Sequence, residues 1–192
     1  MAFKPNYRFE RAERARLKQA RKDEKLKRQH ERSSARRDGR LSTDQLKQII
    51  DDHRAWLDSG GERGTKADLS HAEIEGALWR ADLREADLSF AVLRGVDLDH
   101  VQLQRANLRH ADMTGASLWQ ADLRDADLRS ASLRGAKLDH ADLSGADLHG
   151  ADCTGGSFWG ARLNATDAKD ALGLTAAQLE HALIDDSAQS PN

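Results

Sequence analysis

The residue types in this sequence that could support chemistry are eight histidines and a single cysteine, Cys153. Imidazole and thiolate groups hold metal ions when several lie at close spacing, but no close set of histidine, cysteine and carboxylate recurs along the chain. The motifs GxxxxGK[ST], GxGxxG and GxSxG are also absent from the sequence. We therefore expect no enzyme activity, no catalytic residue, no metal site and no cofactor, and we interpret Cys153 as a buried thiol.

Three tryptophans stand forty residues apart, and two aspartates lie midway between them, each followed by a histidine. Aromatic side chains placed regularly outside a core are favoured as anchors of protein interfaces. We expect a flat partner-binding face made of Trp79, Asp99, His100, Trp119, Asp139, His140 and Trp159. In the alternative interpretation the rings lie flat over neighbouring backbone, or Trp79 and Trp159 pack under terminal helices.

A five-residue period positions these side chains. From Ala67 to about Asp170 a large apolar residue recurs every fifth position, and alanine, valine or glycine stands two positions before nearly every one. One residue is missing in the segment "GALW", which shifts the period between Ile74 and Leu78. Neither a helix nor a flat strand keeps one face apolar at this period. A solenoid that turns a corner in every repeat does, with leucine and alanine pointing inward.

The segments "ADLRDADL", "ANLRHADM" and "ADLSGADLHGAD" resemble the A(D/N)LXX motif of the pentapeptide repeat family. The resemblance implies an all-β solenoid over residues 67–170, a right-handed quadrilateral β-helix with four pentapeptides per coil. About five coils would result from residues 67–170 at that repeat length.

Two helices are predicted to flank the repeats and to cover their ends. Ser42 and Gln45 form a capping-box pattern at the start of residues 41–66, which we interpret as a capping helix and linker. Thr175 and Gln178 repeat the pattern in residues 171–192, interpreted as a second capping helix with a polar tail. Homodimers that form through the C-terminal helix are known in the family that the sequence resembles, but Asp185, Asp186 and the polar tail leave such a dimer open here.

Residues 1–40 form a basic arm, with 15 Lys and Arg against 6 Asp and Glu, a net charge of +9. The other residues hold 30 − 15 = 15 bases against 32 − 6 = 26 acids, a net charge of −11. With almost no large aliphatic side chains, the arm is expected to form a solvated helix or to stay disordered. Its candidate anion-binding residues are Arg11, Arg14, Arg16, Lys18, Arg21, Lys22, Lys25, Lys27 and Arg28.

These features favour a non-catalytic scaffold that binds a protein partner. Two alternatives stay open. The resemblance suggests a DNA mimic that binds DNA gyrase or another type II topoisomerase, and the arm suggests direct binding of nucleic acid. With one cysteine no intramolecular disulfide forms, and the sequence has no apolar run of membrane-spanning length and no signal peptide. We expect a cytoplasmic location.

Overall fold

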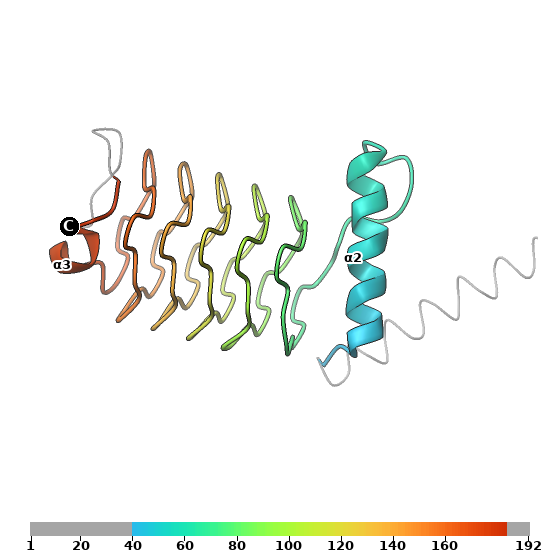
Figure 1. Ribbon diagram of the computed structural model, residues 1–192, viewed down its shortest axis with the longest axis horizontal. Helices are drawn as coiled ribbons and strands as arrows, with labels where there is room; N and C mark the ends of the chain where they lie inside the picture. Colours follow the sequence, from blue (N-terminus) through green and yellow to red (C-terminus); the bar gives the residue numbers. More distant parts are fainter. Residues whose placement is uncertain (1–39, 184–192) are drawn as a thin grey trace, which may run out of the picture. The chain divides into compact units, whose positions relative to one another are not determined.

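The computed structural model describes residues 40–183, and their backbone pairs at a constant offset along the chain. From Ala77 to Leu172 each bridge joins a residue to the one twenty positions later, in parallel. At one such bridge the Leu98 amide donates to the Ser117 carbonyl (2.7 Å), and the Ser117 amide donates to the Val96 carbonyl (3.0 Å). The chain thus forms a solenoid whose successive coils stack side by side along one axis (Figure 1).

The first coil is one residue shorter than the others. Asp68 pairs with Asp87 and Glu73 pairs with Val92, both at an offset of nineteen, before the offset of twenty begins at Ala77. This confirms that the residue missing from "GALW" shortens one coil without breaking the inward pattern. The shorter coil still contributes Leu69 and Ile74 to the interior.

The interior consists of the predicted columns of large and small apolar side chains. The inward residues from Leu83 to Leu148 are all at most 2% exposed, and alanine alternates with leucine along most of them. Their methyl and isobutyl groups belong to one continuous buried cluster. Because protein interiors are close-packed, the inward alanine and leucine of each repeat together fill its share of the interior. The outward side chains are under no such constraint and can vary.

Each corner is a four-residue turn. The Ala91 amide donates to the Leu88 carbonyl (3.1 Å), and the third residue of the turn, Phe90, has a φ of 59°. Positive φ at that position, together with the bond from the first to the fourth residue, is the signature of a type II turn. Gly95 occupies the same position of its turn and also has a positive φ, 64°. Glycine is not required there, however, because Phe90 and His100 adopt the same conformation.

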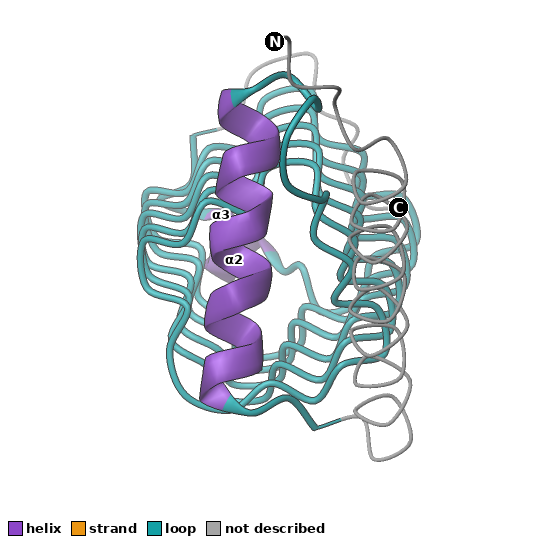
Figure 2. Cartoon of the chain, turned by 90° about the vertical axis from the view of Figure 1, so that its right-hand side faces the viewer, coloured by secondary structure: helices purple, strands orange, loops and turns teal. Residues whose placement is uncertain are grey.

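Helix α2 spans Thr43–Asp58 and lies across the first coil (Figure 2). The predicted capping box is present: the Ser42 hydroxyl accepts from the Gln45 amide (3.2 Å), and the Gln45 side chain accepts from the Ser42 amide (2.9 Å). Leu46 on its inner face belongs to the same buried cluster as the repeats. The helix therefore shares the interior of the solenoid.

Helix α3 is a single turn, Ala176–Leu179, shorter than the pattern in residues 171–192 suggests. Its capping box between Thr175 and Gln178 is present. The helix ends early because the chain returns to the solenoid, where Leu183 pairs with Arg162. Neither described helix is long and apolar enough to span a bilayer.

His53 fastens α2 to the repeats from a fully buried position. The Ala67 amide donates to its Nδ1 (3.1 Å). Since Nδ1 is then an acceptor, the proton of the neutral ring lies on Nε2, which donates to the Arg84 carbonyl (3.0 Å). Burial lowers the pKa of His53, and the bond to the Arg84 carbonyl only partly opposes this. The neutral ring is therefore the form that the fold requires.

We expect acidification to destabilise the fold through His53. Because its pKa in the folded state lies below the unfolded value of about 6.5, the unfolded chain binds the proton first, and the free energy of unfolding falls as the pH drops below that value. Urea unfolding at several pH values should show this slope in the wild type and a shallower slope in His53→Gln. Every other ionisable group is common to the two proteins, so equal slopes would contradict the account.

Candidate protein-binding surface

The structure places the seven candidate residues on one side of the solenoid, which we call the tryptophan face: Trp79, Asp99, His100, Trp119, Asp139, His140 and Trp159. The three indoles stand directly after an inward leucine or phenylalanine, at the first outward position of a corner. They are 53%, 39% and 54% exposed in chain order. Adjacent coils lie about 4.8 Å apart, so successive indoles lie roughly 10 Å apart along the face.

The aspartates between the tryptophans are internal hydrogen-bond acceptors. Asp99 Oδ1 accepts from the Trp119 amide (3.0 Å) and from the Ser117 hydroxyl (2.6 Å). Asp139 repeats the arrangement one unit later, with the amide of Trp159 and the hydroxyl of Ser157. Each carboxylate thus satisfies the backbone amide that the coil ladder leaves without a carbonyl partner. It fixes the position of the tryptophan in the next coil.

The two histidines fill the space between indoles. The ring of His100 stands edge-on to Trp119, with centroids 4.8 Å apart, and it also contacts Trp79 at 6.5 Å. His140 contacts Trp159 in the same way at 4.7 Å. Edge-to-face pairs of this kind are favourable because the positive edge of one ring meets the negative face of the other. The face therefore presents supported rings in place of freely rotating ones.

A second aromatic stack lies at another corner and was not selected from the sequence. Phe90, which is 48% exposed, stacks between His71 and His110 at centroid distances of 4.8 and 4.7 Å. All three residues occupy the same corner position in successive coils. A comparison of the third residues of turns about twenty positions apart in the sequence would have revealed this stack. We call it the Phe90 stack.

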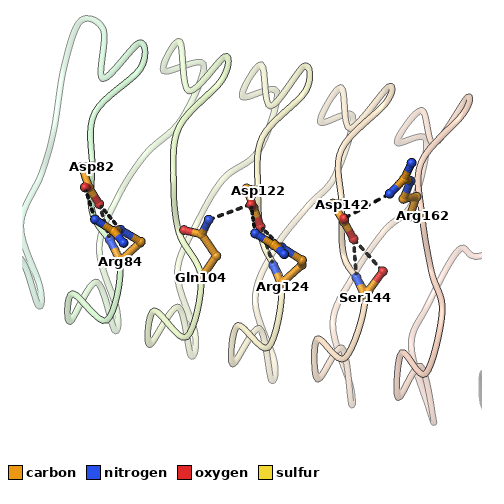
Figure 3. Close-up of polar contacts among 8 residues, drawn as sticks. All are labelled: Asp82, Arg84, Gln104, Asp122, Arg124, Asp142, Ser144 and Arg162. Carbon is orange, nitrogen blue, oxygen red and sulfur yellow. Dashed lines mark hydrogen bonds and ion pairs between the residues drawn. The ribbon is translucent and has the colours of Figure 1, made fainter.

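Several other outward acids pair with an arginine, either two positions later in the same repeat or in an adjacent coil. Figure 3 shows this arrangement on one side: Arg84 bonds to Asp82, Arg124 bonds to Asp122, and Arg162 approaches Asp142 from the next coil. Although burial raises the pKa of Asp82, hydrogen bonds from Arg84 hold it below its ordinary value. Like charges stacked at coil spacing would repel one another, and the interleaved arginines offset this repulsion.

Acids at other bridge positions behave alike. The Arg129 guanidinium lowers the pKa of Asp127, and hydrogen bonds from Thr154 and Arg134 lower the pKa of Asp152 to about 2. These carboxylates are ionised at any physiological pH and are held by their neighbours. Their arrangement stabilises the wall and does not provide a proton donor near neutrality.

Cys153 points into the interior and is fully buried, as predicted. Burial raises the pKa of its thiol to about 12, so the reactive thiolate is not formed at neutral pH. Among residues 40–183 no group of three or more histidine, cysteine or acidic side chains could hold a metal ion. The candidate anion-binding residues of the arm, Arg11 to Arg28, lie outside the described residues.

Comparison with protein families identifies the repeat. The family model described as pentapeptide repeats matches eight copies, over residues 81–120, 106–145 and 141–184. Comparison with curated protein sequences finds no significant match.

Solved structures of pentapeptide repeat proteins are similar to the chain. One from the Arabidopsis thaliana thylakoid lumen is 28% identical over 59% of this chain and 69% of its own, with a TM-score of 0.32. HetL of the cyanobacterium Nostoc sp. strain PCC 7120, a protein involved in the regulation of heterocyst differentiation, is 31% identical over 66% and 76%, with a TM-score of 0.25. QnrB1, a plasmid-mediated fluoroquinolone resistance protein, is 17% identical over 60% and 85%, with a TM-score of 0.35. Superpositions with such TM-scores support no functional argument.

The contact between His140 and the backbone of the next coil offers a test of the tryptophan face. A Cβ added at Gly160 would lie 2.7 Å from His140 Nδ1, whereas one at Gly155 would meet no atom within 4 Å. Both glycines have a similar φ, 67° and 69°. Each alanine substitution should cost about 1 kcal/mol from the left-handed conformation, but only Gly160→Ala should displace the imidazole from Trp159. Nuclear magnetic resonance of the His140 ring protons reports this displacement, and unchanged shifts in Gly160→Ala would contradict the geometry.

Proposed function

The chain belongs to the pentapeptide repeat family, and on this premise we propose that it is a non-catalytic scaffold that binds a protein partner through the tryptophan face. Family membership makes its solenoid a right-handed β-helix. The observation that supports the proposal is the exposure of three large indoles at one repeated position. The equivalent inward side chains, by contrast, are almost completely buried.

The geometry of the face favours an extended partner. Indoles roughly 10 Å apart on a wall of uniform coils form a row of anchors, and His100 and His140 support them from the sides. Tryptophan is enriched among the residues that dominate binding energy at interfaces. A helix or a strand of another protein lying along the solenoid axis could contact all three rings. In this proposal Asp99 and Asp139 position the indoles and lie at the rim of the contact.

We further propose the finer architecture that the sequence pattern suggests: a quadrilateral coil, about five coils in all, and helical covers at both ends. Leu46 of α2 packs in the common buried cluster. At the other end the Gln178 side chain donates to the Cys153 carbonyl (3.1 Å) and to the Gly156 carbonyl (2.8 Å). These contacts support a division into 41–66, 67–170 and 171–192, and we propose residues 1–40 as a separate arm on the basis of their charge.

The two alternative functions have weaker support. A DNA mimic needs a continuous negative surface, yet several outward acids of the described coils pair with arginines, as Asp122 does with Arg124 and Asp152 with Arg134. Nucleic-acid binding rests on the basic arm, whose nine candidate residues lie outside the described part of the chain. A salt-dependent affinity that disappears on removal of residues 1–39 would favour this second alternative.

Trp119→Ala should abolish partner capture while leaving the fold nearly intact. The ring is 39% exposed, and its loss removes an edge contact worth about 1 kcal/mol, whereas Leu118→Ala, at a fully buried position, should cost about 2 to 5 kcal/mol. The measurement combines urea unfolding with quantitative capture of proteins from a lysate of the source organism.

The matched control is Phe90→Ala, which removes an exposed ring from the Phe90 stack. A partner that the wild type and Phe90→Ala capture equally, and that Trp119→Ala loses, would support the tryptophan face. Loss of capture in both variants would contradict a contact specific to the tryptophan face. A loss of stability in Trp119→Ala as large as in Leu118→Ala would show that the indole serves packing.

A further inference from the structure

A cleft of about 290 Å³ lies between α2 and the first coil. We call it the N-terminal cleft. Its apolar surface comes from Leu46 and Ile50 of the helix and from Trp79 of the coil, whose indole is 53% exposed. The proposed function uses Trp79 as the first anchor of the tryptophan face, but it does not involve the helix side of the cleft.

Three cations surround this apolar surface. Lys47 and Arg54 lie on the exposed side of α2, and the Arg80 guanidinium lies over the Trp79 ring, 4.5 Å from its centroid. No carboxylate in residues 40–183 forms an ion pair with any of the three, and Asp51 is the one acid in the lining. A ligand that complements the cleft therefore combines an apolar side chain with carboxylates.

The chain itself contains such a segment at its other end. Residues 184–186 read Ile, Asp, Asp, an apolar side chain followed directly by two carboxylates. The rest of the C-terminal sequence is negatively charged as well. Residues 163–192 contain one base, Lys169, and five acids: Asp167, Asp170, Glu180, Asp185 and Asp186. The N-terminal cleft is thus lined by bases, whereas the last thirty residues of the sequence carry mainly acids.

The two ends of one molecule are too far apart to meet. Trp79 and Trp159 are four coils apart, about 19 Å at the usual spacing between paired strands, and Leu183 pairs beyond the second of them, with Arg162. Three residues of fully extended chain after Leu183 reach about 10 Å. Asp186 therefore cannot reach the N-terminal cleft of its own molecule.

We propose that the N-terminal cleft binds residues 184–186 of a second copy of the chain, so that molecules associate head to tail. Ile184 enters the apolar space beside Ile50 and Trp79. Asp185 and Asp186 pair with Lys47, Arg54 and Arg80 at the rim. Because the two surfaces of this contact differ, a head-to-tail pair still has a free cleft at one end and a free segment at the other, and association continues beyond the dimer.

The experiment is sedimentation velocity of the full chain over a range of protein concentrations, at low and at high salt. The wild type should form species larger than a dimer as its concentration rises, and added salt should weaken the association because the rim charges are exposed. A wild type that remains monomeric, or that stops at a dimer, would overturn the proposal. A closed dimer would instead indicate a self-complementary contact such as one between C-terminal segments.

Two charge-reversed variants make the test specific. Lys47→Glu/Arg54→Glu reverses the cleft, and Asp185→Lys/Asp186→Lys reverses the segment. Neither pair of substitutions removes a contact described within residues 40–183. Each variant alone should associate about tenfold more weakly or worse. Circular dichroism and thermal unfolding confirm that both variants are folded before the comparison.

An equimolar mixture of the two variants should recover association. The acidic segment of the first fits the unchanged cleft of the second, and the basic segment of the second fits the reversed cleft of the first, so the mixture forms alternating chains. Failure of the mixture to associate, or wild-type association by either variant alone, would overturn the proposal. None of these substitutions touches Trp119 or Trp159, so partner capture through the tryptophan face is tested separately.

Discussion

The parallel backbone ladder between residues twenty positions apart is the constraint on which the rest of this structure depends. It can repeat only if the interior of every coil has the same size, which the alternating alanines and leucines provide. Once this condition is met, equivalent residues of successive coils lie one strand spacing apart. Outward side chains of any type are then arranged in columns, and a column of chemically similar residues becomes a surface.

Stacking places acids of like charge close together, and neighbouring side chains have to offset their repulsion. Acids at the bridge position pair with arginines two residues later, as in Asp82 with Arg84, or accept from hydroxyls, as in Asp142 with Ser144. On the tryptophan face, Asp99 and Asp139 instead accept from the amide of the following tryptophan. The same residue type thus stabilises the wall at most positions and positions an aromatic anchor at two.

Much of the fold could be predicted because its signals are local. The five-residue period, the missing residue in "GALW" and the capping boxes at Ser42 and Thr175 are visible within a few residues of sequence, and the structure contains each of them. Translating the period into a coil of four repeats required the family resemblance. That coil length predicts Trp79, Trp119 and Trp159 on one face, and in the structure they lie there.

Other features could not be predicted because they depend on neighbours in adjacent coils. The edge contact of His100 with Trp119 and the stack of Phe90 between His71 and His110 join residues about one coil apart. The position of α2 likewise depends on two hydrogen bonds of His53, one to the backbone of Ala67 and one to that of Arg84. No local sequence pattern predicts these bonds. The short extent of α3 follows from the pairing of Leu183 with Arg162, a contact between repeats and flank.

The central claim is that inward alanines set the interior size and that outward positions are free to vary. Urea unfolding of Ala136→Leu and Lys137→Leu tests it most directly, because these neighbours in one coil receive the same new side chain. Ala136 is fully buried and Lys137 is exposed. The account predicts a loss of about 1 to 3 kcal/mol from overpacking in Ala136→Leu and a change within about 0.5 kcal/mol in Lys137→Leu. Equal effects of the two substitutions would contradict it.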